Sequence, residues 1–561
     1  MRAFAELIDR LALTRSRNAK LAILRDYLRV TPDPDRGWAL AALTGDLTFS
    51  VAKPAVIRRV IEARLDPVLF RWSYDYVGDL AETAALAWPV DPARRPNREP
   101  SLGEVVDALS AARRGEVERL IEGWMDALDP RGRWAMLKLV TGALRIGLSA
   151  RLARAATAML RPAEHPGPPA PEGEAPPTAL PPIDVADIEE LWHGLTPPYV
   201  DLFAWLEGAA ERPDAQGAGR FRPVMLATAL DEAELDRLSP ADFLAEWKWD
   251  GVRVQAVIEG DVRRLYSRSG DDISSAFPDV LSGLDFEGVV DGELVIRRED
   301  VVAPFGDLQQ RLNRKTADPR LQASHPAAII AYDLMALGDM DLRPRPLTER
   351  RAALEAMLAE RPQSRMIISP VLEFDGWENL AALRADPPIG AAAEGVMLKR
   401  RDSAYVAGRP KGPWFKWKRD PHLIDAVLMY AQRGHGKRSS FYSDFTFGVW
   451  DEVGALSPVG KAYFGFTDEE LKQLDKFVRD HTTERFGPVR AVTATREFGL
   501  VLEIAFEGLN RSTRHKSGVA MRFPRIARIR WDKPAREADT LATVQGLLQT
   551  LEGEGGRLAS R

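Results

Sequence analysis

The sequence predicts a chain of three regions with different folds: an all-α region, an α+β region and an all-β region. Length is the first observation, because 561 residues exceed what one hydrophobic core supports and indicate two to four domains. The second is a change from helical periodicity to short β runs near residue 221. The third is a further shortening of the strands after Asp420, which is typical of a small β-barrel.

The composition is that of a soluble globular protein, with 45% apolar and 28% charged residues. Cysteine is absent, which excludes disulfides and any zinc or iron–sulfur site with cysteine ligands. Charged residues interrupt the N-terminus, so no signal peptide is expected, and no apolar run is long enough to cross a bilayer. We therefore expect a soluble cytoplasmic protein with no membrane partner. The net charge of −5 does not by itself suggest a nucleic-acid partner.

Helical periodicity dominates the chain up to about residue 210. In the stretch 115–128 apolar residues recur at steps of three and four, which places them on one face of an amphipathic helix. The stretch 162–182 is too rich in proline to pack and predicts a disordered loop. The helical pattern resumes at 185–195.

Short runs rich in Val, Ile and aromatic residues follow, bounded by Gly and Asp, and they predict strands. Helical stretches such as 347–360 lie between them, so this part of the chain is α+β. The strand candidates are 252–260, 262–270, 288–296, 327–337, 425–434, 444–451 and 499–508.

Lys248 lies inside an apolar run, "EWKWDGVRV", that spans residues 246–254. One interpretation is a strand residue that faces solvent. The other is a desolvated amine that acts as a nucleophile. The tetrad Lys-x-Asp-Gly is a weak signal by itself, because ordinary residue frequencies produce it by chance in roughly one chain in ten of this length.

An ordered series of motifs follows this lysine along the chain. It comprises "YSRSG" (266–270), "DGELV" (291–295), "AYDLM" (331–335), "EGVMLK" (394–399), "WFKWKRD" (414–420) and "RIRWDK" (528–533). The series resembles the superfamily of covalent lysyl-nucleotidyltransferases, and within it the ATP-dependent DNA ligases of bacteria and archaea. The segments 139–149, 221–227 and 501–534 resemble the same family, so the similarity touches most of the chain.

The resemblance implies a domain for each of the three regions. Residues 1–212 would form a helical DNA-binding domain, 220–420 an α+β nucleotidyltransferase (adenylation) domain, and 421–545 an OB-fold domain. Residues 546–561 would form a C-terminal tail.

Lys248 is the expected nucleophile, which attacks the α-phosphorus of ATP. A free lysine has a pKa of about 10.4 and must lose its proton before it attacks. Burial and neighbouring cations lower a lysine pKa, and the tryptophans beside Lys248 together with Lys416 and Lys418 could supply both conditions. The two later lysines alternate with aromatic residues, so both can point into one pocket. The alternative, a solvated cationic edge, would expose Trp414 and Trp417 to water.

Glu293 and Glu394 are the candidate ligands for Mg²⁺ or Mn²⁺, because a metal beside a triphosphate takes oxygen ligands and neutralises charge as pyrophosphate leaves. A single Glu at a strand end is usually just solvated. Two glutamates in this order after a lysine favour a metal site. The resemblance implies that Glu293 also contacts the ribose.

The remaining nucleotide contacts are implied by the resemblance. Tyr332 would stack on adenine, although an aromatic residue in such a strand is more often part of a core. Glu246 shares the strand face of Lys248 and could accept a hydrogen bond from the adenine amino group, which favours ATP over GTP. Basic residues would bind phosphate or ribose oxygens, and Lys411 is an alternative to Arg409 among them. These residues are Arg253, Arg268, Arg409, Lys416, Lys418, Arg530 and Lys533.

Two segments are strongly basic although the whole chain is acidic. Residues 399–419 carry eight cationic side chains against one aspartate, and residues 507–533 carry eight against two carboxylates. A charge run is usually a solvated face. Two runs that bracket nucleotidyl-transfer motifs favour contacts with DNA phosphates and sequence-independent binding. The expected DNA-binding residues are Arg511, Arg514, Lys516 and Arg525.

The resemblance implies an ATP-dependent DNA ligase that seals nicks in duplex DNA, as a monomer, in repair, replication or recombination. An RNA ligase or a capping guanylyltransferase is the alternative within this chemistry, and the helical region and Glu246 argue against capping. A catalytically inactive DNA-binding scaffold is the alternative outside it. An NAD-dependent ligase is disfavoured because the cysteines of its zinc module are missing. The pathway, the preferred DNA end, the metal preference and any protein partner stay open.

Overall fold

The structure is a computed structural model of residues 1–561. It describes the whole chain apart from short gaps. The gaps are residues 15, 50, 51, 53, 78, 90, 92, 94, 95, 97, 114, 143, 145, 162–181, 214–218, 313, 315, 390, 391, 434–441, 464–466, 488, 514, 554, 555 and 558–561. The predicted disordered loop at 162–182 lies almost entirely outside the described residues.

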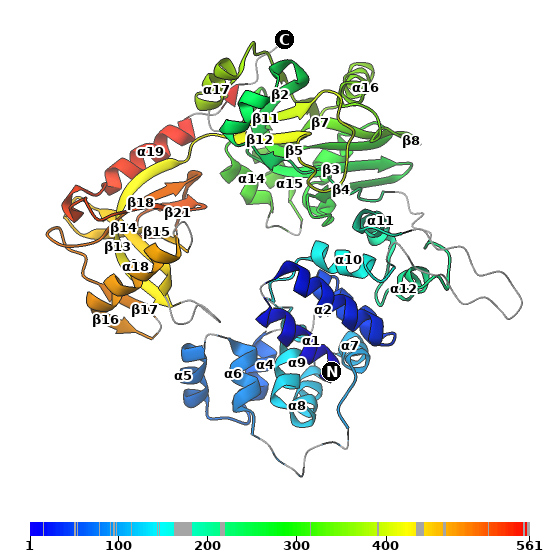
Figure 1. The fold of residues 1–561 in the computed structure, drawn as a ribbon, viewed down its shortest axis with the longest axis vertical. Helices are drawn as coiled ribbons and strands as arrows, with labels where there is room; N and C mark the ends of the chain where they lie inside the picture. Colours follow the sequence, from blue (N-terminus) through cyan, green and yellow to red (C-terminus); the bar gives the residue numbers. More distant parts are fainter. Residues whose placement is uncertain are drawn as a thin grey trace, which may run out of the picture. The chain divides into compact units, whose positions relative to one another are not determined.

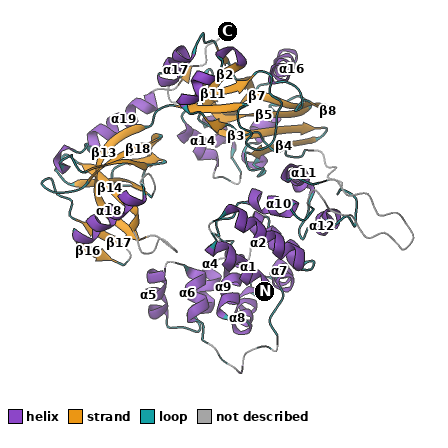
Figure 2. Ribbon diagram, in the orientation of Figure 1, coloured by secondary structure: helices purple, strands orange, loops and turns teal. Residues whose placement is uncertain are grey.

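The chain divides into two compact units, Met1–Gly217 and Ala218–Arg561. Helices dominate the first unit and strands the second (Figure 2). The division falls between the helical and α+β regions that the sequence predicts, which end at 212 and begin at 220. The further boundary predicted at 420 lies inside the second unit and stays a prediction.

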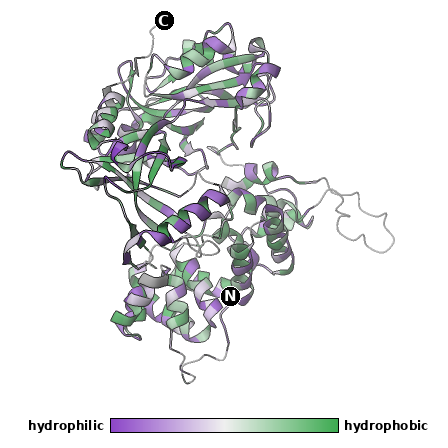
Figure 3. Cartoon of the chain, turned by 60° about the vertical axis from the view of Figure 1, so that its left-hand side comes forward, coloured by the Kyte–Doolittle hydropathy of each residue, from purple (hydrophilic) through white to green (hydrophobic). Residues whose placement is uncertain are grey.

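The first unit packs its helices around one hydrophobic core. Hydrophobic and hydrophilic residues alternate around these helices in Figure 3, which is the pattern of amphipathic helices. The predicted helix at 115–128 is observed as α8. The helices are α1 (Arg2–Leu13), α2 (Arg17–Val30), α3 (Asp35–Thr44), α4 (Pro54–Glu62), α5 (Pro67–Val77), α6 (Leu80–Ala87), α7 (Leu102–Ala111), α8 (Val117–Ala127), α9 (Pro130–Thr141), α10 (Ala150–Ala158), α11 (Val185–Leu191) and α12 (Val200–Leu206).

The second unit begins with a region of two sheets and several helices, residues 220–420, which we call the middle region (Figure 1). One sheet has the strand order β1-β12-β11-β2-β10. Its strands are β1 (Thr228–Ala229), β2 (Phe243–Trp249), β10 (Val371–Leu372), β11 (Ala393–Arg400) and β12 (Trp414–Lys418).

The other sheet of the middle region has β5 at its centre, paired with β3, β6 and β7. Its strands are β3 (Val252–Glu259), β4 (Val262–Ser267), β5 (Gly288–Arg298), β6 (Val301–Val302), β7 (Ala327–Leu337), β8 (Met340–Asp341), β9 (Met366–Ile368) and β22 (Gly556–Arg557). The helices of the region are α13 (Pro278–Ser282), α14 (Phe305–Leu312), α15 (Pro319–Ser324), α16 (Leu347–Glu360) and α17 (Trp377–Ala385). The predicted strands at 252–260, 262–270, 288–296 and 327–337 and the predicted helix at 347–360 are confirmed.

The C-terminal β region, residues 421–545, is built on an antiparallel sheet and a hairpin. In the sheet β13 pairs with β14, β17 and β18, while β19 and β20 form the separate hairpin. The elements are β13 (His422–Arg433), β14 (Tyr442–Trp450), β15 (Leu456–Ala462), α18 (Asp468–Asp480), β16 (Thr482–Phe486), β17 (Val489–Val492), β18 (Val501–Phe506), β19 (Gly508–Arg511), β20 (Val519–Arg522), β21 (Arg525–Arg530) and α19 (Leu541–Gly553).

The C-terminal end differs from the predicted tail at 546–561. Helix α19 runs across the expected boundary, because Val544 and Leu548 are buried against the core of the C-terminal β region. The short strand β22 then pairs with β6 of the middle region. Across the described residues, every helix is too short or too polar to span a membrane.

Candidate functional site

Lys248 lies near the end of β2, two residues before a turn that passes the chain to the other sheet. The predicted single run 246–254 is therefore two strands, β2 and β3, joined at Asp250 and Gly251. A side chain on Gly251 would place its Cβ 2.4 Å from the carbonyl oxygen of Leu294 and 2.8 Å from Cγ of Glu293. The glycine of the Lys-x-Asp-Gly tetrad thus allows the turn to pack against the strand that carries Glu293.

The ammonium group of Lys248 forms an ion pair with Glu394 on the neighbouring strand β11, with 2.5 Å between Nζ and Oε2. Lys418 of β12 approaches the same oxygen at 3.6 Å. Gly395 has a φ of +141°, and a Cβ there would lie 2.2 Å from the carbonyl oxygen of Trp417. A glycine after Glu394 therefore permits the close pairing of β11 with β12 that brings the two lysines to one carboxylate.

The charge state of Lys248 differs from the sequence-based expectation of a lowered pKa. Desolvation by burial is the largest single influence and lowers the pKa, but the negative charges of Glu394, Glu293 and Asp250 together raise it. The same contact, against the cost of burial, lowers the pKa of Glu394 to about 2. The structure therefore holds Lys248 as an ammonium ion.

Asp250 contacts an arginine from the C-terminal β region that the sequence analysis did not single out. Arg522 of β20 donates to both oxygens of Asp250, at 2.5 and 3.0 Å, and lies 3.8 Å from Glu394. Burial raises the pKa of Asp250 to about 6 even though Arg522 acts in the opposite direction. The basic composition of 507–533 was the available signal, but it does not distinguish Arg522 from its neighbours.

Glu293 is half-buried in β5, opposite Arg253 of β3. Desolvation raises the pKa of Glu293 to about 8, although Lys248 and Arg253 lower it. No cluster of three or more Asp, Glu, His or Cys side chains suited to a metal occurs within the described residues. The predicted metal site would therefore consist of Glu293 and Glu394 alone, and it stays a prediction.

Several cations that the sequence analysis selected come together at β12. Desolvation lowers the pKa of Lys416, and the charges of Lys418, Arg409, Lys248 and Arg268 lower it further. In the described chain, neither Lys416 nor Arg409 has a carboxylate within ion-pair distance. A cluster of cations with an incomplete set of counter-charges fits a polyanion such as a triphosphate.

Glu246 is 1% exposed and is held by two buried cations: Arg351, which the sequence analysis did not name, and Lys399, which it counted in the basic segment 399–419. Arg351 of α16 donates to one oxygen at 3.0 Å, and Lys399 of β11 donates to the other at 3.2 Å. The Lys399 ammonium also lies 4.3 Å from the ring centroid of Tyr332. These ion pairs fix the position of the Glu246 carboxylate, while its predicted contact with the adenine amino group stays a prediction.

Arg253 is more heavily engaged than a phosphate-binding arginine was expected to be. Its guanidinium donates to both oxygens of Asp291, at 3.0 and 2.6 Å, and to the carbonyl oxygen of Met225 at 2.6 Å. Arg268, in contrast, is exposed. The predicted role in binding ATP therefore fits Arg268 directly, whereas Arg253 is mainly fixed by protein groups.

The structure does not bring Arg530 and Lys533 to Lys248. Lys533 pairs with Asp425 at 2.7 Å, and Arg530 pairs with Asp532 at 2.9 Å. All of these residues belong to the C-terminal β region, and Lys533 lies in the turn after β21. Their predicted contact with ATP requires a different arrangement of that region.

Two of the four predicted DNA-binding residues line a cavity of about 650 Å³ between the middle region and the C-terminal β region. Arg511 and Arg525 line it together with Asp250, Glu394 and Arg522. Lys516 is exposed in the turn between β19 and β20. Arg514 lies outside the described residues.

Comparison with protein-family models assigns three consecutive segments to one kind of protein. Residues 1–158 match the model "DNA ligase N terminus", 224–418 match "ATP dependent DNA ligase domain", and 438–533 match "ATP dependent DNA ligase C terminal region". The second and third segments contain Lys248 and Arg522, respectively.

Curated relatives extend the similarity to nearly the whole chain. A "Probable DNA ligase" of Anaeromyxobacter dehalogenans is 32% identical over 97% of this chain and 98% of its own length. A "Probable DNA ligase" of Opitutus terrae is 32% identical over 99% of this chain, and one of Koribacter versatilis is 35% identical over 59%. The chain spans 62% and 61% of the length of the latter two.

A solved structure supports the fold. "Pmar-Lig_PreS3" covers 94% of this chain and is itself covered to 99%, with a TM-score of 0.58 and 16% identity. At this identity the likeness concerns the fold alone. It includes the helical unit and both regions of the second unit.

Proposed function

The chain belongs to the family of ATP-dependent DNA ligases, and from this membership we propose that it seals nicks in duplex DNA through lysyl-AMP and 5′-adenylated DNA. The observation that carries the proposal is the Lys248 amine at 2.5 Å from Glu394, beside a cluster of cations on β12. An amine, a carboxylate and a polyanion site in one pocket are what covalent nucleotidyl transfer requires.

In the first step Lys248 Nζ forms a bond to the α-phosphorus of ATP, and the bond to pyrophosphate breaks. The Lys248 ammonium must first release a proton to water, and its hydrogen-bonded ion pair with Glu394 opposes this release. The 5′-phosphate of a nick then displaces the lysine and takes AMP. In the last step the 3′-hydroxyl attacks that phosphate and AMP leaves.

Glu394 and Glu293 would hold Mg²⁺ or Mn²⁺. Carboxylate oxygens are the ligands these ions prefer, and the metal would supply positive charge where pyrophosphate leaves. Desolvation raises the pKa of Glu293 to about 8, and a cation bound beside it would lower that pKa and favour the carboxylate form.

Adenine would stack on Tyr332, whose ring lies 4.3 Å from the Lys399 ammonium and is partly exposed. Glu246 would accept a hydrogen bond from the adenine amino group, with its carboxylate held in place by Arg351 and Lys399. Lys416, Arg268 and Arg409 would bind phosphate oxygens, since the charges of Arg268 and Arg409 both act on Lys416.

Nicked duplex DNA would bind through phosphate contacts, without sequence preference. Arg511 and Arg525, which line the cavity, and the exposed Lys516 would make such contacts. The helical first unit would be an all-α DNA-binding domain. The protein would act as a monomer in the cytoplasm, associated with the nucleoid.

Radiolabelled ATP and a nicked duplex test the proposal together. The protein should acquire a covalent AMP label that survives denaturation and should join the nick with ATP, but not with NAD. Lys248→Ala removes the amine and should abolish the label. A labelled Lys248→Ala protein would overturn the assignment of the nucleophile, and an unlabelled wild-type protein would overturn the function.

A further inference from the structure

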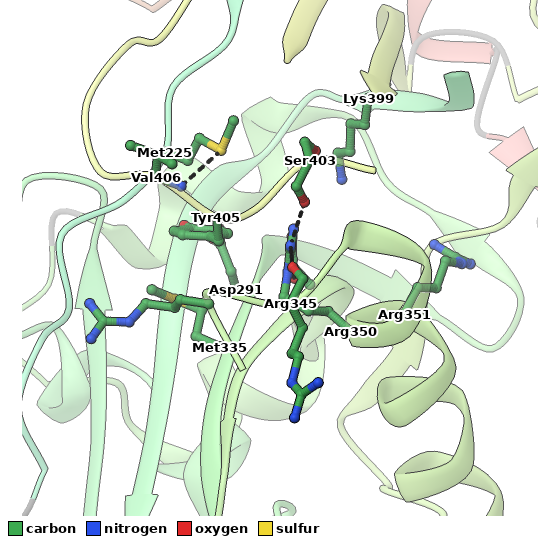
Figure 4. Close-up of polar contacts among 12 residues, drawn as sticks. Met225, Asp291, Met335, Arg345, Arg350, Arg351, Lys399, Ser403, Tyr405 and Val406 are labelled. Carbon is green, nitrogen blue, oxygen red and sulfur yellow. Dashed lines mark hydrogen bonds and ion pairs between the residues drawn. The ribbon is translucent and has the colours of Figure 1, made fainter. Parts of the chain in front are cut away.

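The segment that connects β11 to β12 carries a buried tyrosine, Tyr405, which no part of the proposed reaction uses. Figure 4 shows Tyr405 between Asp291 and Met225, with Ser403 and Arg350 on the other side of the same segment. The tyrosine is 4% exposed. A buried hydroxyl group must find a hydrogen-bond partner, and its partners here lead directly to the candidate site.

Tyr405, Asp291 and Arg253 form a closed set of hydrogen bonds. The hydroxyl of Tyr405 donates to Oδ2 of Asp291 at 2.6 Å and accepts from Nη2 of Arg253 at 3.1 Å. The same nitrogen of Arg253 donates to Oδ2 of Asp291 at 2.6 Å. Because Asp291 is fully buried, each partner that it loses would leave a charged oxygen uncompensated.

The charge states support this direction of donation. Burial raises the pKa of the Tyr405 phenol, and the adjacent Asp291 charge raises it further, so the hydroxyl keeps its proton at neutral pH. Arg253 stays a cation, since the pull of Asp291 outweighs desolvation and raises its pKa. Tyr405 is therefore a donor to the carboxylate and an acceptor from the guanidinium.

A second arginine fixes the tyrosine from the other side. The Arg350 guanidinium lies 5.6 Å from the ring centroid of Tyr405 and donates to the carbonyl oxygen of Ser403 at 2.7 Å. Arg350 is itself bound to both oxygens of the buried Asp333. The ring of Trp414, the first residue of β12, packs edge-on against Tyr405 at 5.6 Å. The position of the hydroxyl is thus set by contacts from several elements.

Arg253 in turn lies at the nucleotide site. Its guanidinium carbon is 5.8 Å from the ring centroid of Tyr332, and its strand position is opposite Glu293. Arg253 adjusts the pKa of Glu293, so its placement affects the charge that the site presents. The Tyr405 segment continues to Gly408, which pairs with Met225, and then to Arg409.

We propose that Tyr405 is a positioning residue for the nucleotide: its hydroxyl, through Asp291, fixes the guanidinium of Arg253 in the plane and distance at which it meets ATP beside Tyr332. This inference rests on the proposed function. It adds a residue outside the motif series to the determinants of ATP binding.

The test compares Tyr405→Phe with a matched control, Tyr199→Phe. The control removes the same kind of group, because the hydroxyl of Tyr199 donates to the carboxylate of Asp46 at 2.7 Å in the first unit. Self-adenylation is measured against ATP concentration, together with the melting temperature. Tyr405→Phe should raise the KM for ATP about tenfold with little change in kcat, the size expected for one hydrogen bond to a charged group. Tyr199→Phe should leave both constants unchanged.

A double-mutant cycle shows whether Tyr405 acts through Arg253. Arg253→Lys keeps the charge opposite Asp291 but cannot bind it with two parallel bonds. In an Arg253→Lys background, Tyr405→Phe should raise the KM for ATP no further, since the guanidinium that Tyr405 positions is gone. A normal KM in Tyr405→Phe, or full additivity in the cycle, would overturn the inference while wild-type labelling still upheld the proposed function.

Discussion

Arg522 binds both carboxylate oxygens of Asp250, so a residue of the β19–β20 hairpin contacts the turn that follows Lys248. Both side chains are largely buried. Nearby, Lys418 of the middle region pairs with Glu507 of the C-terminal β region at 2.9 Å. In this arrangement Arg530 and Lys533 bind acidic residues of their own region instead. The β19–β20 hairpin of the C-terminal β region thus contacts the turn that follows Lys248, whereas the "RIRWDK" segment (528–533) does not.

Arg522→Leu should impair the sealing of a pre-adenylated nick more than self-adenylation. The substitution leaves Asp250 without its partner in the arrangement seen here, and losing one member of a buried, hydrogen-bonded pair costs about 2–5 kcal/mol. Single-turnover sealing should therefore slow by about 30-fold or more. Arg536→Leu, an exposed arginine of the same region, is the control and should seal normally. Equal losses in both steps would contradict a step-specific role for Arg522.

Lys533→Ala should impair self-adenylation more than the sealing of a pre-adenylated nick. Lys533 has to leave Asp425 and reach the triphosphate for the first step, where a cation stabilises the departing pyrophosphate. Self-adenylation should slow by about 10²-fold, while a nick supplied already adenylated is sealed nearly as fast as by wild type. Lys472→Ala on α18 serves as the control. If Lys533 is only a surface ion-pair residue, both single-turnover rates will stay normal.

Glu394→Gln should slow self-adenylation by about 10²–10³-fold, because it removes the charge next to Lys248 and one of two proposed metal ligands. The deficit should shrink as Mg²⁺ or Mn²⁺ is raised. Glu349→Gln, at an exposed carboxylate, is the matched control. A variant with wild-type turnover at low Mg²⁺ would exclude the metal role, provided that its melting curve is unchanged.

Glu293→Gln should stabilise the nucleotide-free protein at alkaline pH. The folded-state pKa of about 8 lies above the ordinary value of 4.5, so the native protein binds more protons than the unfolded chain between these values and its stability falls as pH rises through that window. The fall amounts to at most about 1.4 kcal/mol per pH unit for one group. Melting temperatures from pH 4 to pH 9 should show wild type and variant diverging in that window. Parallel curves would contradict the raised pKa.

The sequence determined the elements of the site and their order. Strands β3, β4, β5 and β7 follow from runs rich in Val, Ile and aromatic residues bounded by Gly and Asp, which are local properties of the chain. Lys248, Glu293 and Glu394 were identifiable because their motifs are short, contiguous and ordered. The structure then brings Lys248 and Glu394 to 2.5 Å, although they are 146 residues apart.

Charge states and partners were decided by the tertiary structure. Neighbouring cations suggested a lowered pKa for Lys248, but three carboxylates from different segments converge on it and raise the pKa. Arg253 resembles a phosphate ligand in the sequence, yet Asp291 and Met225 occupy most of its donors. Such outcomes depend on Coulomb energies at a few ångströms and on burial, and neither is a property of a local pattern.

Contacts between regions also could not be predicted from the sequence. Arg522 is one of eight cations in a basic segment, and only the hairpin geometry selects it as the partner of Asp250, 272 residues away. Tyr405 is an unremarkable aromatic residue until folding surrounds it with Arg350, Asp291 and Arg253. The sequence alone determines which groups are available for nucleotidyl transfer, because their chemistry is intrinsic. The tertiary structure decides which of them are charged, free or fixed, because those properties arise only when distant segments exclude water together.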